Sequence, residues 1–517
     1  MPITPTYPGV YIEELSSGVR TIAPVATSIT AFVGRAKWGP TDEPITVNSF
    51  AEFQRKFGGL DARSMMSYAV YQYFVNQGSV AIIVRVAPAT ATVAKLEDGI
   101  PFEAKGAGIW GNKIQVRVDY KTKDPTDTNL FNLFVYDEDT KSLEVFRNVS
   151  VDKDSQRYVK NILEEESELI RVAKKPANPL TRPNASNDVT GSGEWFETPG
   201  SSQMLNGGGG DKDEITDANL LGDQDTKKGI YALENADLFN ILCLPPTQRD
   251  ADIDNDTWSK ALAYAAKRRA MLLIDPPSDW TDVGKAVKNL DTLRRGLGGE
   301  DFTRNSAIFF PRVIMPDPLK DNRLAEFVPC GAIAGIFART DVQRGVWKAP
   351  AGINAGVLGA NAFTVKLNDP DNGLLNPHGV NCLRSFPVYG NVVWGSRTLA
   401  GDDQIGSDWK YLPVRRFALF LQESLYRGTQ WVVFEPNDEP LWSSIRINIT
   451  SFMIGLYRQG AFQGATPNDA FYVKCDKDTT TQNDINRGIV NIEIGFAPLK
   501  PAEFVILKFK QIAKQNS

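Results

Sequence analysis

The sequence is poor in the residues on which most catalytic and metal sites depend. It has one histidine, His378, and four cysteines that lie far apart without a CxxC pair. A single histidine removes most histidine-dependent triads and any two-histidine zinc site, and the cysteine spacing argues against a zinc cluster or a disulfide framework. Neither GxSxG nor GxxxxGK[ST] occurs, so no hydrolase elbow or nucleotide-driven motor is indicated. We therefore expect no enzyme, with no catalytic residue, metal site or cofactor.

Long apolar runs and an excess of basic charge are also missing. No stretch of about eighteen apolar residues is present, as a membrane-spanning helix would require. The 57 Lys and Arg residues are outnumbered by 62 Asp and Glu residues, for a net charge of -5. Such a chain has no overall basic field to attract nucleic acid. The N-terminus lacks a basic start followed by an apolar core, so it is no secretory signal. We expect a protein kept in the cytosol that neither binds nucleic acid nor inserts into a membrane.

The 517 residues predict several domains, in an α/β and α+β multidomain chain. Short apolar strands alternate with helical stretches in two separated regions, which is typical of a largely parallel sheet with helices on both faces. A capping box at Ser49 and Glu52 opens one of these helices, and Gly58 ends it. The expected strands of this sheet are those from Ser28, Val80–Val86, Leu238–Leu244, Met271–Ile274 and Ser306–Phe310.

The stretch between these two regions has a different character. Ile114–Tyr120 and Leu130–Tyr136 alternate as strands do, and Lys174–Gly210 is rich in Pro, Asn, Ser and Gly. We interpret it as an inserted, β-rich, solvent-facing outer domain with a loose connection. The expected regions are an N-terminal arm at 1–24, a middle α/β domain at 25–90 and 229–400, the insertion at 91–228, an inner C-terminal domain at 401–497 and a C-terminal arm at 498–517.

A glycine-rich run in the insertion imitates a nucleotide-binding motif. Gly106, Gly108 and Gly111 match GxGxxG, the phosphate-binding turn of dinucleotide folds. That turn opens a helix, whereas here Ile114–Tyr120 follows as a strand. We therefore interpret the run as a glycine-rich turn and expect no bound cofactor.

Two long helices are expected late in the chain, at Pro413–Arg427 and Glu439–Gln459. Arg415 and Arg416 place positive charge on the first of them. A solvated helix face explains these arginines without any function, and a docking face for an acidic partner is the functional alternative.

Both ends of the chain are expected to be extended arms. Closely spaced prolines prevent a helix at the N-terminus, and Val10–Leu15 within it is capable of forming a strand. Near the C-terminus Val490, Ile492, Ile494 and Phe496 alternate with polar residues, as in a strand with one buried face. Pro498 and Pro501 follow, and Phe504–Lys510 resumes as a second extended run.

The last of these strands need not fold back on the strand before it, because no tight hairpin sequence joins them. A terminal strand that leaves its own fold carries unpaired backbone groups, and an open sheet edge in another subunit satisfies them. The ends of the chain therefore predict assembly by strand exchange.

Five longer motifs stand out along the chain. They are PGVYIEE (Pro8–Glu14), AGIWGNKIQVRV (Ala107–Val118), AGIFARTDVQRGVWKAPAG (Ala334–Gly352), VVWGSRTL (Val392–Leu399) and the closing GFAPLKPAEFVILK. Together these motifs resemble the tail sheath proteins of contractile phages, over nearly the whole chain and least between residues 121 and 227. One departure is Cys330 in VPCG, where that family often has a second proline and a serine.

The resemblance implies a tail-sheath fold and a structural role. Sheath subunits form stacked hexameric rings around an inner tube, attached to a baseplate, and the extended sheath is metastable. Triggering shortens it and drives the tube through a target envelope. The implied partners are further copies of the chain, the inner tube protein, baseplate and tail terminator proteins and related sheath paralogues. The particle would assemble in the bacterial cytoplasm, as a phage tail, an R-type pyocin or an extracellular injection system.

The residues expected to carry assembly follow from the two arms and the resemblance. Two alternatives stay open, a non-contractile scaffold or shell protein and an α/β enzyme. The predicted assembly residues are Val10, Ile12 and Leu15 in the N-terminal arm, Val505, Leu507 and Phe509 in the C-terminal arm, Val490, Ile492, Ile494 and Phe496 in the receiving sheet, and Arg415 and Arg416 facing the tube.

Overall fold

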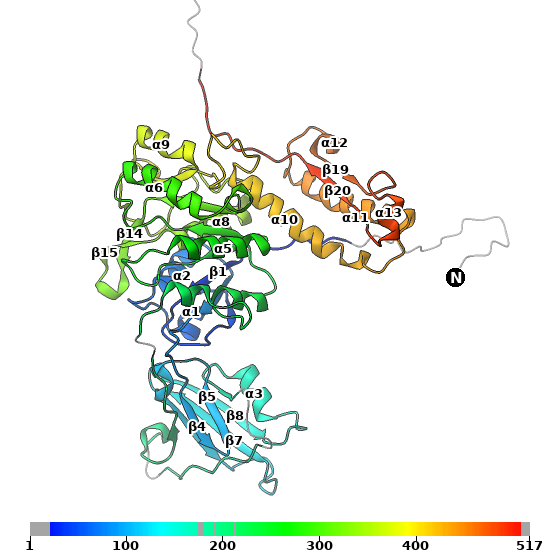
Figure 1. The fold of residues 1–517 in the computed structure, drawn as a ribbon. Coiled ribbons are helices and arrows are strands. Elements are labelled where there is room, and N and C mark those ends of the chain that lie inside the picture. Colours follow the sequence, from blue (N-terminus) through cyan, green and yellow to red (C-terminus); the bar gives the residue numbers. More distant parts are fainter. Residues whose placement is uncertain (1–20, 174–179, 190–192, 211–212, 508–517) are drawn as a thin grey trace, which may run out of the picture. The chain divides into compact units, whose positions relative to one another are not determined.

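The computed structural model describes residues 21–173, 180–189, 193–210 and 213–507 (Figure 1). The backbone contacts divide the chain into two compact units. Residues 28–342 and 350–410 form one, called the body unit here. Of the described residues, 21–27, 343–349 and 411–507 form the other, called the arm unit.

The body unit is organised around an eight-stranded sheet formed by described residues, in the order β18-β17-β13-β12-β11-β1-β3-β2. Its inner strands run parallel to one another, and only the edge strands β2 and β18 pair antiparallel. The predicted largely parallel sheet is therefore confirmed. Its strands are β1 (Thr30–Gly34), β2 (Pro44–Val47), β3 (Ala81–Arg85), β11 (Ile241–Cys243), β12 (Met271–Ile274), β13 (Ser306–Phe310), β17 (Val380–Phe386) and β18 (Gly390–Val393).

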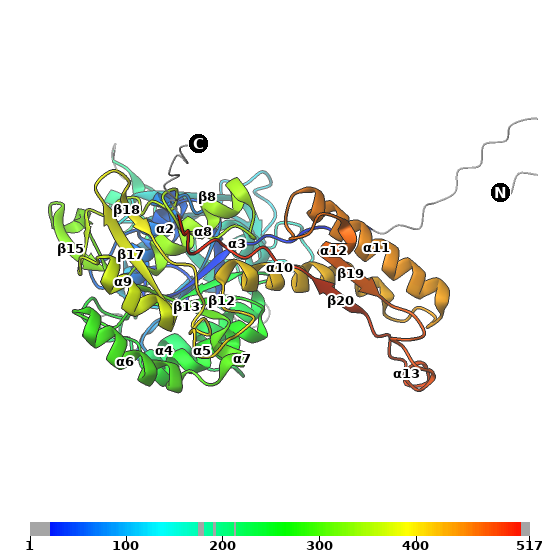
Figure 2. The ribbon, with the colours of Figure 1, turned by 90° about the horizontal axis from the view of Figure 1, so that it is seen from above.

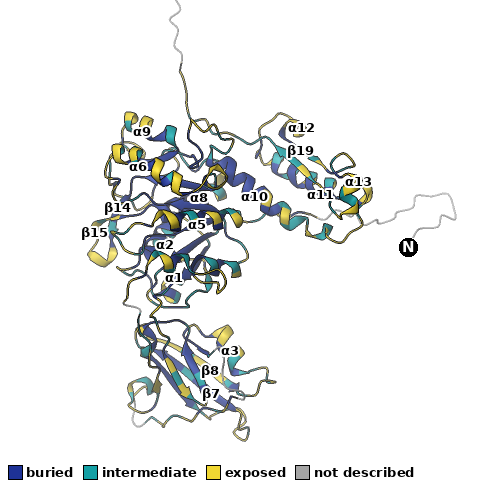
Figure 3. Cartoon of the chain, in the orientation of Figure 1, coloured by how far each residue is buried: buried dark blue, intermediate teal, exposed yellow. Residues whose placement is uncertain are grey.

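Helices cover both faces of this sheet (Figure 2). On β1, Ala31 and Val33 join the apolar core that also contains residues of α5 and α6. The intervening Phe32 points the other way, and its ring meets Tyr73 of α2 at 5.6 Å. Strands buried on both faces need no polar alternation (Figure 3). The helices of this layer are α1 (Phe50–Phe57), α2 (Met65–Val75), α4 (Asp217–Leu221), α5 (Asn255–Lys267), α6 (Val283–Gly296), α7 (Glu300–Thr303), α8 (Cys330–Arg344) and α9 (Asp369–Leu375).

The predicted N-cap and C-cap of α1 form where the sequence places them, although the Glu52 side chain reaches back to Asn48 instead of closing a capping box on Ser49. Ser49 Oγ accepts a hydrogen bond from the Glu52 backbone N–H at 3.1 Å, and Glu52 Oε2 accepts from the Asn48 N–H. Gly58 ends α1 in the left-handed conformation, with φ of 88°. The start and end of α1 are therefore set by local sequence.

Helix α8 was not among the predicted helices. It is buried on every side from Cys330 to Arg339, and all of these residues but Arg339 are small or apolar. Gly331 and Gly335 allow it to approach α2 closely, since a Cβ at either position would collide with the backbone oxygen of Ala69 or Tyr73. A helix of this kind has no amphipathic period for a sequence analysis to detect.

The insertion folds around two antiparallel sheets, ordered β10-β6-β7-β8 and β4-β5-β9. Alternate residues of β6 and β7, such as Val116 and Leu133, face a core shared with helix α3. The elements are β4 (Lys95–Asp98), β5 (Ile100–Ala104), β6 (Ile114–Asp119), β7 (Leu130–Asp137), β8 (Ser142–Ser150), α3 (Val159–Glu166), β9 (Ile170–Val172) and β10 (Gln203–Met204). A third small sheet, in the body, consists of β14 (Val313–Asp317), β15 (Arg323–Phe327) and β16 (Ala362–Phe363).

The arm unit packs two long helices and a small hairpin around its own apolar core. The long helices have the predicted positions to within one residue. Asp438 caps the second by accepting from the Leu441 N–H at 3.2 Å. The elements are α10 (Leu412–Gly428), α11 (Glu439–Arg458), α12 (Pro467–Ala470), β19 (Phe471–Lys474), α13 (Gln482–Asn486) and β20 (Glu493–Phe496). No helix formed by the described residues, in either unit, is long and apolar enough to cross a membrane.

Candidate functional site

The candidate assembly site is the hairpin of β19 and β20 in the arm unit. The two strands pair antiparallel from Phe471 with Phe496 to Lys474 with Glu493. One face rests on the core, where the Phe496 ring meets Phe417 of α10 at 5.6 Å. Among the described residues the sheet has only these two strands, so the outer edge of each has no strand partner there. Such edges are templates for a further strand.

The predicted receiving residues lie on this hairpin or just before it. Ile494 and Phe496 belong to β20 and are partly buried against the core. Val490 and Ile492 also pack on the core but precede the strand, contrary to the longer strand expected from the alternation. The reason is that β19 ends at Lys474, so the chain before Glu493 has no strand to pair with.

The C-terminal arm leaves this hairpin as an extended, exposed chain. Phe504, Val505, Ile506 and Leu507 are each 73–79% exposed, and they form no helix or strand. The described part of the run expected from Phe504, residues 504–507, therefore forms no strand with any other described residue. The start of the arm is attached to α10, since Tyr411 Oη donates a hydrogen bond to Glu503 Oε2 at 3.2 Å. Phe509, the third predicted residue of this arm, lies outside the described residues.

The three predicted residues of the N-terminal arm, Val10, Ile12 and Leu15, also lie outside the described residues. The described chain begins at residue 21, and Ile22 is at once buried, 4% exposed, in the core of the arm unit. The Val25 N–H donates to Ser424 Oγ on α10 at 3.2 Å. The segment that precedes the first body strand is therefore attached to the arm unit.

Arg415 and Arg416 do not lie on a solvated helix face. They are 6% and 4% exposed, and Arg416 Nη2 donates to the Thr27 carbonyl oxygen at 3.0 Å. The sequence predicted exposure because two adjacent arginines on a helix usually extend into solvent. Their contact with a tube stays a prediction, and burial gives them little surface with which to make it.

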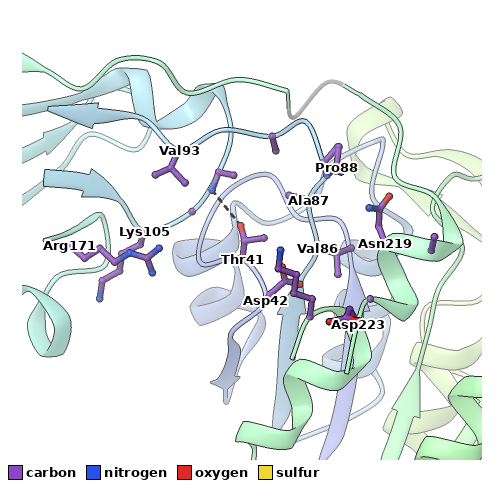
Figure 4. Close-up of a pocket in the computed structure, with 17 residues that line it drawn as sticks. Thr41, Asp42, Val86, Ala87, Pro88, Val93, Lys105, Arg171, Asn219 and Asp223 are labelled. Carbon is purple, nitrogen blue, oxygen red and sulfur yellow. Dashed lines mark hydrogen bonds between the residues drawn. The ribbon is translucent and has the colours of Figure 1, made fainter. Parts of the chain in front are cut away.

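A cavity of about 470 Å³ lies in the body unit where the insertion joins the sheet (Figure 4). Most of its charged groups are already engaged within the described part of the chain, and the side chain of Lys228 is the exception. Arg171 pairs with Glu103 and with Glu43, both at 2.9 Å, and Lys105 Nζ donates to the Glu164 carbonyl oxygen at 3.1 Å. Burial lowers the pKa of Lys105. The cavity therefore presents no set of convergent free groups of the kind that a reaction or a charged ligand requires.

The glycine-rich run beside this cavity has a packing role. Gly106 lies against the backbone of Gly39, so closely that a Cβ would collide with the Gly39 carbonyl oxygen. The run leads through a short 3-10 turn into β6, so a strand follows it as expected. The described residues also contain no cluster of three or more His, Cys, Asp or Glu side chains able to hold a metal ion.

Sequence reasoning missed one buried residue that joins the insertion to the body. Arg85 is at the end of β3 and is 2% exposed. Its guanidinium donates to the carbonyl oxygens of Gly39 and, in the insertion, Ala107, both at 2.7 Å, and to Thr41 Oγ1 at 3.0 Å. The start of the insertion is therefore held against the body at Ala107, while the loose connection expected at Lys174–Gly210 stays a prediction. The only signal in the sequence is an arginine that ends an apolar strand.

Comparisons with known proteins point to one family. The phage tail sheath protein central domain matches residues 221–399, and the phage tail sheath C-terminal domain matches residues 404–512. The tail sheath protein of Vibrio phage KVP40 is 26% identical over 256 residues, which cover 47% of this chain. The match covers 37% of the length of that relative.

Solved structures share the fold over almost the whole chain. The sheath complex of the extracellular contractile injection system PVC, in its contracted state, matches with a TM-score of 0.59 at 20% identity and covers 99% of this chain and 100% of its own. The sixfold-symmetrised baseplate of the anti-feeding prophage matches with a TM-score of 0.55 at 22% identity, covering 99% and 100%. Together with the two domain matches, these similarities show that the chain belongs to the contractile tail sheath protein family, whose members are structural subunits of phage tails and related injection particles.

Proposed function

We propose that the chain polymerises as stacked hexameric rings around an inner tube and shortens on triggering, which drives the tube through a target envelope. The observation that carries this proposal is the open hairpin of β19 and β20 beside an arm with four consecutive exposed apolar residues. One chain thus offers both a strand acceptor and a strand donor, as a polymer linked by strand exchange requires.

The geometry suggests copies of this chain as partners, and the similarity to tail sheath proteins suggests the rest. Copies of this chain would supply the exchanged strands, and the inner tube, the baseplate, a tail terminator and related sheath paralogues would complete the particle. The similarity to a chain of a sixfold-symmetrised baseplate supports rings of six. The particle assembles in the bacterial cytoplasm and is a phage tail, an R-type pyocin or an extracellular injection system.

The energy of such links suits a lattice that changes shape without breaking. A donated strand of about five residues gains about four or five hydrogen bonds at about 1 kcal/mol each, which is a few kcal/mol per arm. One link is weak, but every subunit gives and receives strands, so the links act together. The bodies can then exchange one packing arrangement for another of lower free energy while the arms remain connected.

The first test replaces one exposed apolar residue in the arm. Leu507→Asp is compared with Leu374→Asp, because Leu374 is also exposed, at 58%, but lies on α9 in the body. Both variants should keep the thermal unfolding midpoint of the parent chain. Leu507→Asp alone should fail to form tubes by electron microscopy and sedimentation. Normal tubes from this variant, and from a chain that lacks residues 498–517, would exclude the arm as the link.

The second test concerns shortening. Electron microscopy of the native particle before and after triggering should give two lattice lengths for the same number of subunits. If the lattice of the native particle has the same length under every triggering condition, the chain is a subunit of a rigid scaffold and not of a contractile sheath.

A further inference from the structure

The loop between α10 and α11 holds an aromatic side chain entirely in solvent. Phe434 is 102% exposed and its neighbour Val433 is 58% exposed. The two residues before them, Trp431 and Val432, pack partly against the core of the arm unit. The apolar run therefore begins on the core and ends on a bare tip, called the Phe434 tip here and consisting of Val433, Phe434 and Glu435.

The backbone at the tip is held in an unfavourable conformation. Phe434 has φ of 70°, in the left-handed region that bulky residues rarely adopt. The loop is fixed just after it, because Asn437 Nδ2 donates to the Ile489 carbonyl oxygen at 3.0 Å and Trp442 Nε1 donates to Asn437 Oδ1 at 2.8 Å. A fully exposed ring gains nothing from packing that would offset the strain within this chain. Strain that the surrounding structure maintains points to a function outside the chain.

The charge beside the ring restricts what the tip can bind. Glu435 is exposed and makes no ion pair with any residue that the structure describes. An apolar ring with a free carboxylate next to it is complementary to an apolar surface that carries cations.

The chain presents such a surface at the turn between β14 and β15. Leu319 and Leu324 are 49% and 58% exposed there. Lys320 and Arg323, also exposed, lie next to them and form no ion pair within the described part of the chain. Asp321 is the one acid within residues 319–324, so the two cations outnumber it and the turn carries a net positive charge beside its two exposed leucines. We call this surface the hairpin tip.

We propose that the Phe434 tip of one copy docks on the hairpin tip of a second copy. The inference rests on the proposed function, because it assumes that copies of the chain polymerise. It adds a contact between folded surfaces to the strand exchange of the arms. Since the two surfaces are different, the contact is head-to-tail and repeats along a ring or a helix instead of closing a dimer.

Cross-linking between two differently tagged chains tests the contact directly. One full-length chain carries Phe434→Cys and the other carries Leu324→Cys, and both are expressed in the same cells. The four native cysteines are buried and do not compete. Oxidation should join the two tagged chains into a heterodimer on denaturing gels. The matched control replaces Leu324→Cys by Val388→Cys, since Val388 is 83% exposed on a different hairpin, and it should give no heterodimer.

A glycine substitution separates docking from folding. Phe434→Gly removes the ring and relieves the strain, because glycine adopts positive φ readily. The isolated subunit should therefore unfold at a higher temperature than the parent, while the concentration needed for polymerisation should rise at least about tenfold. A merely structural role for the ring would lower the unfolding temperature instead, and that result would overturn the proposal.

Charge reversal tests the choice of partner surface. Glu435→Arg should weaken polymerisation, and Arg323→Glu in the same chain should restore it in part, whereas Arg63→Glu should not.

Cross-linking of Phe434→Cys only to another protein of the particle, or to nothing, would refute docking between copies. If the arm variants block assembly while Phe434→Gly polymerises like the parent, this inference fails and the proposed function stands. If the arm variants form tubes like the parent, the proposed function itself fails, and this inference, which rests on it, fails with it.

Discussion

The carboxylate of Asp275 accepts a hydrogen bond from the backbone N–H of Cys330 at 3.0 Å, which joins the end of β12 to the first turn of α8. The side chain is buried, and burial raises its pKa to about 7. Its second oxygen, Oδ2, has no hydrogen-bond partner among the residues that the structure describes. The body unit therefore contains a carboxyl group that ionises near neutral pH at the start of a helix.

The pH dependence of stability should reveal this group. Its pKa is about 7 in the folded chain and about 4 in the unfolded chain, so the folded state binds more protons between these values. Stability from this group is then fully present below about pH 4 and falls as the pH rises towards 7. Asp275→Asn keeps an oxygen for the Cys330 N–H and cannot ionise. The variant should become more stable than the parent by up to about 4 kcal/mol at pH 8.

The measurement is thermal unfolding of both chains from pH 4 to pH 8. The difference between their unfolding temperatures should widen up to about pH 7 and then stay constant. Asp301→Asn is a control, because that carboxylate is exposed. A constant difference over the whole range would contradict the raised pKa.

Close contact at Gly106 should make this position intolerant of a side chain. Gly106→Ala places a methyl group against the Gly39 carbonyl oxygen, so the chain should lose about 1 to 3 kcal/mol in chemical unfolding. Gly455→Ala is the matched control, since nothing lies within 4 Å of a Cβ there. It should gain up to about 1 kcal/mol, because alanine has a higher helix propensity than glycine and Gly455 lies within α11. Equal effects of the two changes would remove the packing role of Gly106.

The stability of the chain should depend on the several N–H donors of the Arg85 guanidinium and not only on its charge. Arg85→Lys keeps the charge but cannot reach Gly39, Thr41 and Ala107 together. Buried carbonyl oxygens left without a donor each cost about 1 to 3 kcal/mol. Arg85→Lys and Arg85→Ala should therefore both lower stability by at least about 2 kcal/mol and speed proteolysis where the insertion joins the body. Arg63→Ala, at an exposed ion pair, should change neither. Full stability of the lysine variant would show that charge alone suffices.

The hydrogen bond from Tyr411 to Glu503 should fix the start of the C-terminal arm. Tyr411→Phe removes that hydroxyl group and leaves the ring, so the unfolding temperature should change little. Backbone hydrogen exchange should become faster at residues 499–507 but remain unchanged in β19. Tyr472→Phe, which removes an exposed bond to Glu493, should leave the arm unaffected. If exchange in the arm does not change in either variant, this contact does not hold the arm.

Local patterns in the sequence predict much of the fold. The strands at Met271–Ile274 and Ser306–Phe310 have the predicted bounds because short apolar runs end at turn residues. Helix α8 escapes the same reasoning, since its partners, brought close by Gly331 and Gly335, surround it on all sides. Strand β20 is shorter than its alternation suggests, because its partner strand decides where pairing stops.

The candidate site is predictable only in part. The exposed apolar arm at Val505 and Leu507 follows from prolines and alternation in the sequence. The burial of Arg415 and Arg416 depends on tertiary packing, and no local pattern reveals it. The bare ring of Phe434 was also missed, because an aromatic residue in a run such as Trp431–Phe434 is normally assigned to a core.

The order of strands in the eight-stranded sheet also has a consequence during synthesis. Strand β1 lies between β3 and β11, and its Thr30 is aligned with Ile241. The ribosome therefore releases the whole insertion, which has its own core, before the central pairing of the body can form. We expect the insertion to fold first on the nascent chain. Until β11 has been synthesised, β1 lacks one of its two neighbouring strands, and the apolar residues of β1 and β3 are accessible to chaperones.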